Sequence, residues 1–182
     1  MNEVTARDVL DFWFHELDNA RRFARDAALD AAISVRFGAT LQAAIRGELQ
    51  AWRATPQGRL AEIVVLDQFS RNIWRDTPQA FAQDPQALTL AQELVAGGLA
   101  EALPVEQRAF ALMPYMHSES GLIHLLAEPL FSQPGLEGTL AFELRHRAII
   151  ERFGRYPHRN AILGRLSTTE EVAFLAQPGS SF

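Results

Sequence analysis

The sequence predicts an all-α fold of about eight or nine helices, packed as antiparallel hairpins. Apolar residues recur every three or four positions, and no segment shows the two-residue alternation of a half-buried strand. Capping residues, prolines and glycines interrupt this pattern at short intervals, as they do at helix ends. The expected connections are short, which places sequential helices next to one another. The spacing is too irregular for a regular solenoid of helical pairs.

The first two apolar segments illustrate the pattern. Thr5, with the acidic Asp8 three residues later, is expected to cap a helix whose core-facing residues are Val9, Leu10, Trp13 and Phe14. From about residue 25 to residue 52 a second stripe predicts one long helix, or two short helices broken at Gly38. The residues of that stripe are Leu29, Ile33, Phe37, Leu41, Ile45 and Leu49.

Three later boundaries share one pattern, a capping residue followed by a proline. Proline suits the first helical position because the missing N–H would have no partner there. Helices are therefore predicted to begin at Thr55-Pro56, at Thr77-Pro78 and at Asp84-Pro85.

The remaining helix ends are expected at glycines, a proline and a capping box. Gly97-Gly98 should end the helix that begins near residue 85, and Pro104 should open the next one. Gly154 is expected in a left-handed conformation after a helix over residues 138–153. Ser167 with Glu170 is predicted to form the capping box of the last helix.

Length and composition suit one domain over residues 1–182, with an ordered core from about 5 to 176 and a tail over 177–182. The 182 residues are 48% hydrophobic and 21% charged, which is typical of a globular chain. The formal net charge of -5 argues against nucleic-acid and membrane partners, which need a broad basic surface. No apolar stretch is long enough for a membrane span, and the acidic N-terminus is unlike a signal peptide, so a cytoplasmic location is expected.

Two residue types are absent, and their absence excludes several kinds of chemistry. Without cysteine the chain has no disulfides, thiolate nucleophiles or cysteine zinc sites. Without lysine it can form neither a Schiff base nor a Walker-type phosphate contact, and all 17 cationic side chains are arginines. Arginine pairs with carboxylate or phosphate through two parallel hydrogen bonds, so bidentate ion pairs are expected. We predict no cofactor and no metal.

The first of three polar blocks lies in residues 59–76. Asp67 and Gln68 interrupt an otherwise apolar run and are therefore expected to be at least partly buried. Arg71, one turn further on, can supply the partner that a buried carboxylate needs. The residues alone favour a structural ion pair here over an acid–base role for Asp67.

The second block is PYMHSES, residues 114–120. His117 and Glu119 follow an apolar helix and are expected near its end, facing a cleft. Metal ligands on one helix are usually three or four residues apart, so His-x-Glu is a weak metal signal, and His117, Glu119 and His158 together are only a minor alternative. A histidine bonded to a carboxylate also serves simply as a packing contact, and both readings stay open.

The third block, residues 145–165, holds six arginines and two histidines against one glutamate. His146 is predicted to turn inward with Phe142, Ile149, Ile150 and Phe153. Beyond the helix, Gly154, Tyr156 and Pro157 form a constrained bend that orients Arg155, His158, Arg159 and Asn160. Converging arginines need an anion among them, which could be an external phosphate or carboxylate or one of the chain's own Asp67, Glu119 and Glu151.

Together, LDQFSRNIWRDTPQAFAQDPQAL, PYMHSE and RFGRYPHRNAILGRLSTTEE resemble the signature segments of the DUF924 family of bacterial proteins. The resemblance implies a tetratricopeptide-like all-α fold and no known reaction. It also implies a set of polar positions, namely Asp67, Gln68, Arg71, Asn72, His117, Ser118, Glu119, Arg155, His158, Arg159, Asn160 and Arg165. After Glu119 this chain departs from the family pattern with SGLIHLLAEPLF, where His124 either replaces a polar contact or lies on the surface.

These observations lead to one hypothesis and two alternatives. The hypothesis is that the three blocks meet at a cleft that binds a small anionic ligand, where Arg71, Arg155 and Arg159 hold the anion and His117 and His158 transfer protons. Asp67, Glu119 and Asn160 would orient the arginines, and His146 and Arg165 would complete the ligand contacts. The first alternative is a helical module that binds a peptide carboxylate, and the second is a purely structural ion-pair network.

Overall fold

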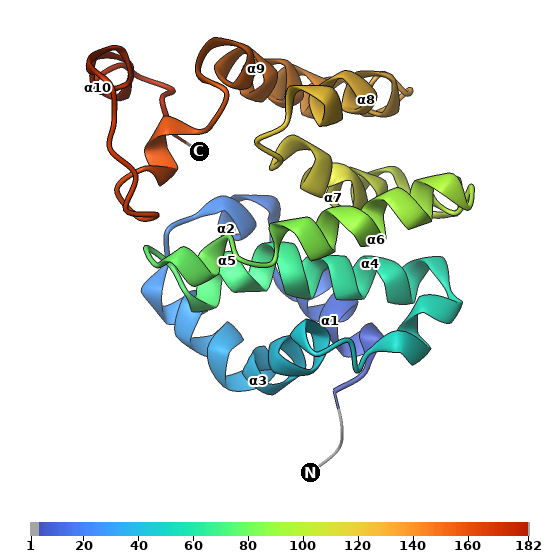
Figure 1. Ribbon diagram of the computed structural model, residues 1–182. Coiled ribbons are helices and arrows are strands. Elements are labelled where there is room, and N and C mark those ends of the chain that lie inside the picture. The colour runs from blue at the N-terminus through green and yellow to red at the C-terminus, as the bar shows by residue number, and fades with distance from the viewer. Residues whose placement is uncertain (1–3, 182) are drawn as a thin grey trace. The chain divides into compact units, whose positions relative to one another are not determined.

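The structure is a computed structural model that describes residues 4–181, and in that range it contains helices, turns and loops but no strand (Figure 1). The all-α prediction is therefore confirmed. The α-helices are α1 (Ala6–Asp11), α2 (Asn19–Phe23), α3 (Ala27–Ile45), α4 (Pro56–Val64), α5 (Ser70–Ile73), α6 (Asp84–Ala96), α7 (Val105–Met116), α8 (Gly121–Phe131), α9 (Glu137–Phe153) and α10 (Thr169–Leu175). Two π-helical segments, η1 (Phe12–Glu16) and η3 (Val65–Phe69), and four 3-10 turns, η2 (Gln50–Ala54), η4 (Pro78–Ala80), η5 (Ala100–Ala102) and η6 (Pro157–Arg159), complete the set.

Contacts divide the chain into two compact units. Unit 1 comprises residues 1–75 and 79–114, and unit 2 comprises residues 76–78 and 115–182. We describe each unit by itself. The single domain expected from the sequence stays a prediction, as does tetratricopeptide-like packing.

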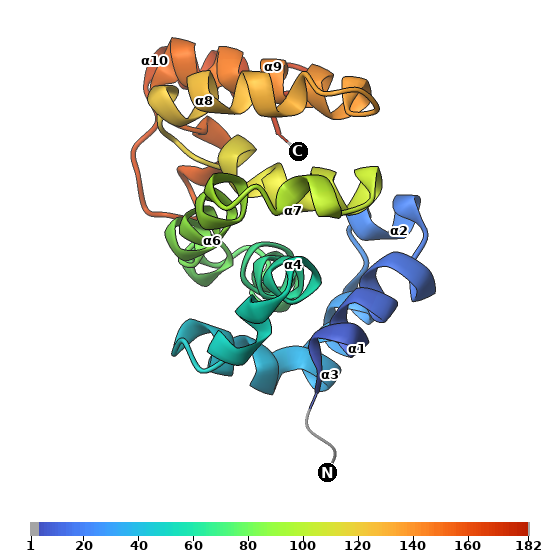
Figure 2. The same ribbon diagram turned by 90° about the vertical axis from the view of Figure 1, so that its right-hand side faces the viewer.

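Unit 1 is built around α4, which contacts α1 and α6 (Figure 2). Its core is aromatic: the Phe37 ring lies 5.0 Å from the Phe12 ring and 4.8 Å from the Phe69 ring. Trp13 is fully buried against Phe110. The inward residues predicted for the first helix, Val9, Leu10, Trp13 and Phe14, are all buried.

The polar first block is carried by one continuous helix. Thr55 caps it through the Gly58 N–H, with Pro56 in the first turn as predicted. The backbone stays right-handed helical at both Val65 and Ser70, so α4, η3 and α5 follow one another without a break. The π turn η3 places Asp67 and Gln68 inside unit 1, where both are buried.

The structure corrects several predicted helix boundaries. The predicted start at Thr77-Pro78 gives only the three-residue turn η4, and Asp84 lies inside the first turn of α6 instead of capping it. The capping box of α10 is formed by Thr168 and Glu171, one residue later than predicted for Ser167. Gly38 does not break α3, which runs unbroken from Ala27 to Ile45.

Unit 2 contains the hairpin of α8 and α9, which lie side by side (Figure 2). Gly154 ends α9 in the left-handed conformation with φ 67, as predicted. The chain then turns at Tyr156, which is fully buried against Ile149 and Ile150. Phe142, predicted to face inward, is 54% exposed. In the predicted tail, Ser180 is buried and its hydroxyl donates to the Leu175 carbonyl.

Candidate functional site

The centre of the candidate site is Tyr156, which links the second and third polar blocks within unit 2. Its hydroxyl donates to the Met116 carbonyl at 2.6 Å, and its backbone N–H donates to Glu119 at 2.7 Å. Its carbonyl accepts a hydrogen bond from Arg165, and the Arg159 guanidinium lies 4.7 Å from the centre of its ring. The bend after α9 is thereby joined to the segment after α7.

Glu119 receives the Arg165 guanidinium in a bidentate pair. The two nitrogens of Arg165 lie 2.7 Å and 2.9 Å from the two carboxylate oxygens. Burial is the largest influence and by itself raises the pKa of Glu119. Hydrogen bonds from Arg165 and the Tyr156 N–H outweigh it, so the pKa of Glu119 lies below its usual range and the carboxylate stays ionised.

Arg155 is held in the same way, but by a carboxylate that the sequence did not indicate. Its guanidinium donates to both oxygens of Glu171, at 2.7 Å and 2.8 Å, and to the Leu166 carbonyl. The hydrogen bonds from Arg155 are the largest influence on Glu171 and, against burial, lower its pKa to about 2. Glu171 also caps α10, so this pair ties the last helix to the bend.

Arg159 and Asn160 are the most deeply buried polar residues of the bend. Arg159 donates to the carbonyl of His117 at 3.1 Å, which connects the third block directly to the second. The Asn160 amide donates to the Ser167 hydroxyl at 3.0 Å, while its side-chain oxygen is buried without a hydrogen-bond donor. Such an orphaned acceptor is uncommon in native proteins.

Four of the chain's five histidines gather in this cluster. The rings of His146, His158 and His124 lie 5.7 Å, 5.6 Å and 6.4 Å from that of Tyr156. Burial is the main influence that lowers the pKa of His146 to about 3, and repulsion from the neighbouring histidines, His117 among them, lowers it further. His146 is therefore neutral, with its Nδ1–H donating to the Phe142 carbonyl.

His124, left open by the sequence, is a core residue. Its Nδ1 lies 2.7 Å from Glu143 and its Nε2 lies 2.9 Å from the Ser118 carbonyl. Both ring nitrogens of His124 therefore have a polar partner. Both side chains are fully buried. The second oxygen of Glu143 is also buried and has no hydrogen-bond donor.

The first polar block forms a separate network within unit 1. Arg71 makes a bidentate pair with Asp84, at 2.8 Å and 3.0 Å, and also lies 3.2 Å from Asp67 as the sequence predicted. Asn72 donates to Asp30, which Arg75 holds through two nitrogens. Gln68 donates to Asp67.

The structure thus brings together the second and third predicted blocks, within unit 2. His117, Ser118, Glu119, Arg155, His158 and Arg165 are partly buried there, whereas His146, Arg159 and Asn160 are buried. Glu151, one candidate anion, instead pairs with Arg147 at the surface. Convergence of the first block, Asp67, Gln68, Arg71 and Asn72, with the other two stays a prediction.

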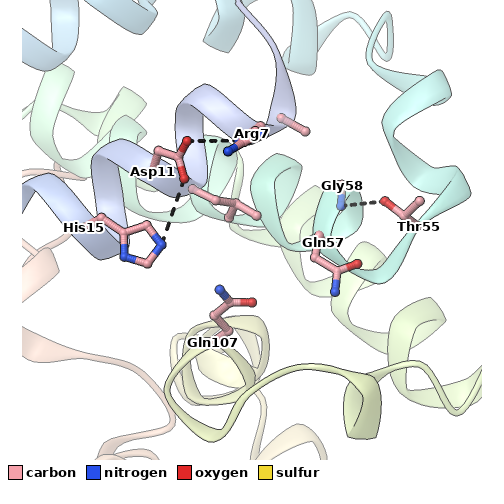
Figure 3. Close-up of a pocket in the computed structure, with 9 residues that line it drawn as sticks. Arg7, Asp11, His15, Thr55, Gln57, Gly58 and Gln107 are labelled. Carbon is pink, nitrogen blue, oxygen red and sulfur yellow. Dashed lines mark hydrogen bonds and ion pairs between the residues drawn. The ribbon is translucent and has the colours of Figure 1, made fainter.

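A cavity of about 330 Å³ lies elsewhere, in unit 1, between α1, α4 and α7. Figure 3 shows Gln107 extending from α7 toward the helical stretch of α1 and η1 that carries Arg7, Asp11 and His15. Asp11 is engaged by both neighbours, at 3.3 Å from Arg7 and 3.9 Å from His15. None of the residues predicted for the site lines this cavity.

Comparison with known proteins decides the family. The model of the family described as "Bacterial protein of unknown function (DUF924)" matches residues 9–179. The chain belongs to the DUF924 family. A solved structure of a protein of unknown function from Agrobacterium tumefaciens has a TM-score of 0.89 and 37% sequence identity, and covers 94% of this chain and 96% of that chain. A search of proteins with curated functions gave no match.

Two features are absent from residues 4–181 of this DUF924 member. In that range no helix is both long and apolar enough to cross a membrane. The same residues contain no group of three or more His, Cys, Asp or Glu side chains arranged to hold a metal ion.

Sequence reasoning missed several partners in the two networks. The sequence predicts Asp84 to be a helix cap and Glu170, instead of the adjacent Glu171, to be the acid of the capping box. The buried acid Glu143 could have been found, because it lies one turn before His146 on the inward face of its helix. Asp30 lies 42 residues before Asn72, and nothing local connects the two.

Proposed function

We propose that unit 2 of this DUF924 protein binds a small anion, a phosphate or a carboxylate, beside Arg159, with His117 and His158 as proton-transfer groups. The reaction class that suits these groups is acid–base hydrolysis or group transfer on a phosphorylated or carboxylated small molecule. The supporting observation is that four histidines and three arginines gather around Tyr156.

The density of guanidinium groups in the cluster favours an anion. Arg155 and Arg165 are paired with Glu171 and Glu119. Arg159 adds a third guanidinium to the same bend, over the Tyr156 ring. A guanidinium in a partly dry environment binds phosphate or carboxylate strongly and with defined geometry.

Exposure separates the four histidines into two roles. His124 and His146 are buried, and the lowered pKa of His146 keeps that ring neutral, so both serve as supports. His117 and His158 are only partly buried, which leaves them accessible for proton transfer to a ligand. The Ser118 hydroxyl, between His117 and Glu119, accepts from the Ser120 N–H and can donate a further hydrogen bond to the anion.

The bidentate arginines take positioning roles in this proposal. Arg155 and Arg165 hold the bend against α10 and against the segment after α7, which fixes where Arg159 and His158 point. The proposal concerns unit 2 alone. Roles of Asp67, Gln68, Arg71 and Asn72 at an anion site stay predictions.

The bidentate pairs also favour a second candidate, the peptide-binding helical module in which the charged blocks are a structural ion-pair network. In that case removal of Arg155 or Arg165 should lower the melting temperature, and removal of His117 or His158 should affect no anion affinity.

The test is calorimetric titration of the full chain with inorganic phosphate and, separately, with succinate. We expect saturable binding of at least one anion, lost or weakened at least tenfold in Arg159→Gln and His158→Gln. His15→Gln, whose side chain is exposed in unit 1, is the matched control and should bind as the parent does. A ligand at about 100 times its Kd should also stabilise the protein by about 2.7 kcal/mol. Absence of binding, or equal binding by all four proteins, refutes the proposal.

A further inference from the structure

The last helix, α10, is attached to unit 2 mainly through an acid. A surface helix normally turns an apolar stripe inward. Of the residues Thr169–Leu175, however, Glu171 alone is buried, and the neighbouring Val172 is 58% exposed. Phe174 adds a partly buried contact, with its ring 5.0 Å from that of Phe153. An isolated helix of seven residues is unstable in water, so α10 stays helical only while it is docked.

The carboxylate of Glu171 is held as a bound anion would be. Two nitrogens of Arg155 donate to its two oxygens at 2.7 Å and 2.8 Å, and the Thr168 N–H donates at 2.7 Å. A guanidinium and a backbone N–H are also the donors that a free carboxylate or phosphate engages. The Arg155 side chain is 29% exposed, so an anion in solution reaches the guanidinium while α10 is still docked.

We propose that α10 is an autoinhibitory cap on the anion site. Glu171 occupies Arg155 when no ligand is present, and an incoming anion takes its place and releases α10 from the bend. The inference rests on the proposed function, because the competing anion is the one bound beside Arg159, four residues further on. It adds a regulatory role for Glu171 and a ligand contact for Arg155.

The other ion pair of α10 is weak. Arg152 pairs with Glu170 at 2.8 Å, but the two side chains are 47% and 63% exposed. Exposed ion pairs contribute little to stability and are screened by salt. With Glu171 displaced, this pair and the ring contact of Phe174 would have to hold the seven residues in place. Release of the whole helix is therefore the expected consequence of losing one buried contact.

The chemistry of the buried contact selects an anion as the group that opens the cap. Hydrogen bonds from Arg155 are the largest influence that lowers the pKa of Glu171 to about 2, so protonation near neutral pH does not release the carboxylate. A guanidinium has donors but no acceptor. Cationic ligands therefore have no partner in Arg155, and a carboxylate or phosphate is the competitor that can replace Glu171.

Hydrogen exchange of the full chain, read by mass spectrometry, tests the release directly. The protein is compared in sodium phosphate, sodium succinate and sodium chloride at one ionic strength, so that screening is equal. In the anion that calorimetry shows to bind, we expect the amides of Thr169–Leu175 to exchange at least about fivefold faster, while those of α8 and α9 are unchanged. Unchanged or slower exchange of α10 with the anion bound overturns the inference and leaves the proposed function standing.

The variant Glu171→Ala removes the competing carboxylate. Calorimetric titration with inorganic phosphate and with succinate should then give a Kd at least about tenfold lower than in the parent protein. The matched control is Glu101→Ala, which removes the same charge from an exposed acid in unit 1 and should leave the Kd unchanged.

The outcomes separate the two proposals. An equal or higher Kd in Glu171→Ala overturns the inference alone, whereas absence of binding by all three proteins refutes the proposed function as well. The exchange experiment uses the parent protein, so it decides the matter even if Glu171→Ala does not fold.

Discussion

Removal of one member of the buried His124–Glu143 pair should cost far more stability than removal of both. In Glu143→Leu, the His124 ring remains fully buried while its Nδ1 loses the partner that lies 2.7 Å away, and a leucine takes its place. Breaking such a buried pair from one side typically costs about 3–5 kcal/mol, because the remaining polar group is left in a nonpolar environment.

The double variant His124→Leu with Glu143→Leu removes both polar groups and also the orphaned second oxygen of Glu143. Replacement of a buried ion pair by apolar residues of similar volume is often neutral or stabilising. We therefore expect the double variant to lie within about 1 kcal/mol of the parent protein, which makes the coupling between the two positions strongly favourable.

The assay is urea unfolding followed by two signals. All three tryptophans, Trp13, Trp52 and Trp74, lie in unit 1, so their fluorescence reports that unit, while circular dichroism reports the helices of both. The loss in Glu143→Leu should appear in the dichroism transition and correspond to a fall in melting temperature of roughly 6–20 °C. A single variant that loses less than about 1 kcal/mol, or a double variant as unstable as the sum of both singles, would refute the reasoning.

The pKa of His146 is about 3 in the folded protein against 6.5 in the unfolded chain, so unfolding takes up a proton between these pH values. The free energy of unfolding should therefore fall as the pH drops from about 6.5 to 3. Urea unfolding repeated across that range should show a weaker pH dependence in His146→Gln than in the parent protein. The pKa of Glu171 is lowered to about 2 from 4.5, so its contribution to stability is complete above pH 4.5 and is lost as the pH falls toward 2. The difference in melting temperature between the parent protein and Glu171→Gln should therefore be large at pH 7 and small near pH 2. A Cβ at Gly58 would lie 1.9 Å from the Trp52 carbonyl oxygen, whereas one at Gly38 would meet nothing within 4 Å. Calorimetry should accordingly show Gly58→Ala destabilised by about 1–3 kcal/mol or more and Gly38→Ala stabilised by about 0.5–1 kcal/mol.

Local signals in the sequence were enough where the interaction they describe is local. The capping box of Thr5 and Asp8, the Thr55-Pro56 start and the left-handed Gly154 all involve residues within one turn of each other. Each is satisfied by the segment itself, so no distant contact competes with it. The pair of Asp67 and Arg71 is also local, four residues apart on one helix, and it forms even though Arg71 makes its bidentate pair with Asp84.

Predictions of helix ends were wrong where an arginine far away in the sequence pairs with the residue on which the prediction relied. Asp84 has the right side chain for a cap, but Arg71 takes both of its oxygens, and the helix begins one residue earlier. In STTEE two overlapping capping boxes are possible, and they cannot be separated by local chemistry. Arg155 holds Glu171, and the box is accordingly the one that contains Glu171.

The lysine-free composition connects these outcomes. A lysine contributes one point charge and could pair with either of two neighbouring acids. The planar guanidinium of arginine binds most strongly to the carboxylate that meets two of its nitrogens. Arg71, Arg155 and Arg165 each hold one carboxylate through two nitrogens, so the choice of partner is geometric. The chain's acids thus pair with most of the arginines gathered after residue 145. Which acid pairs with which arginine is a property of the fold, which the excess of five positive charges counted along the sequence could suggest but could not specify.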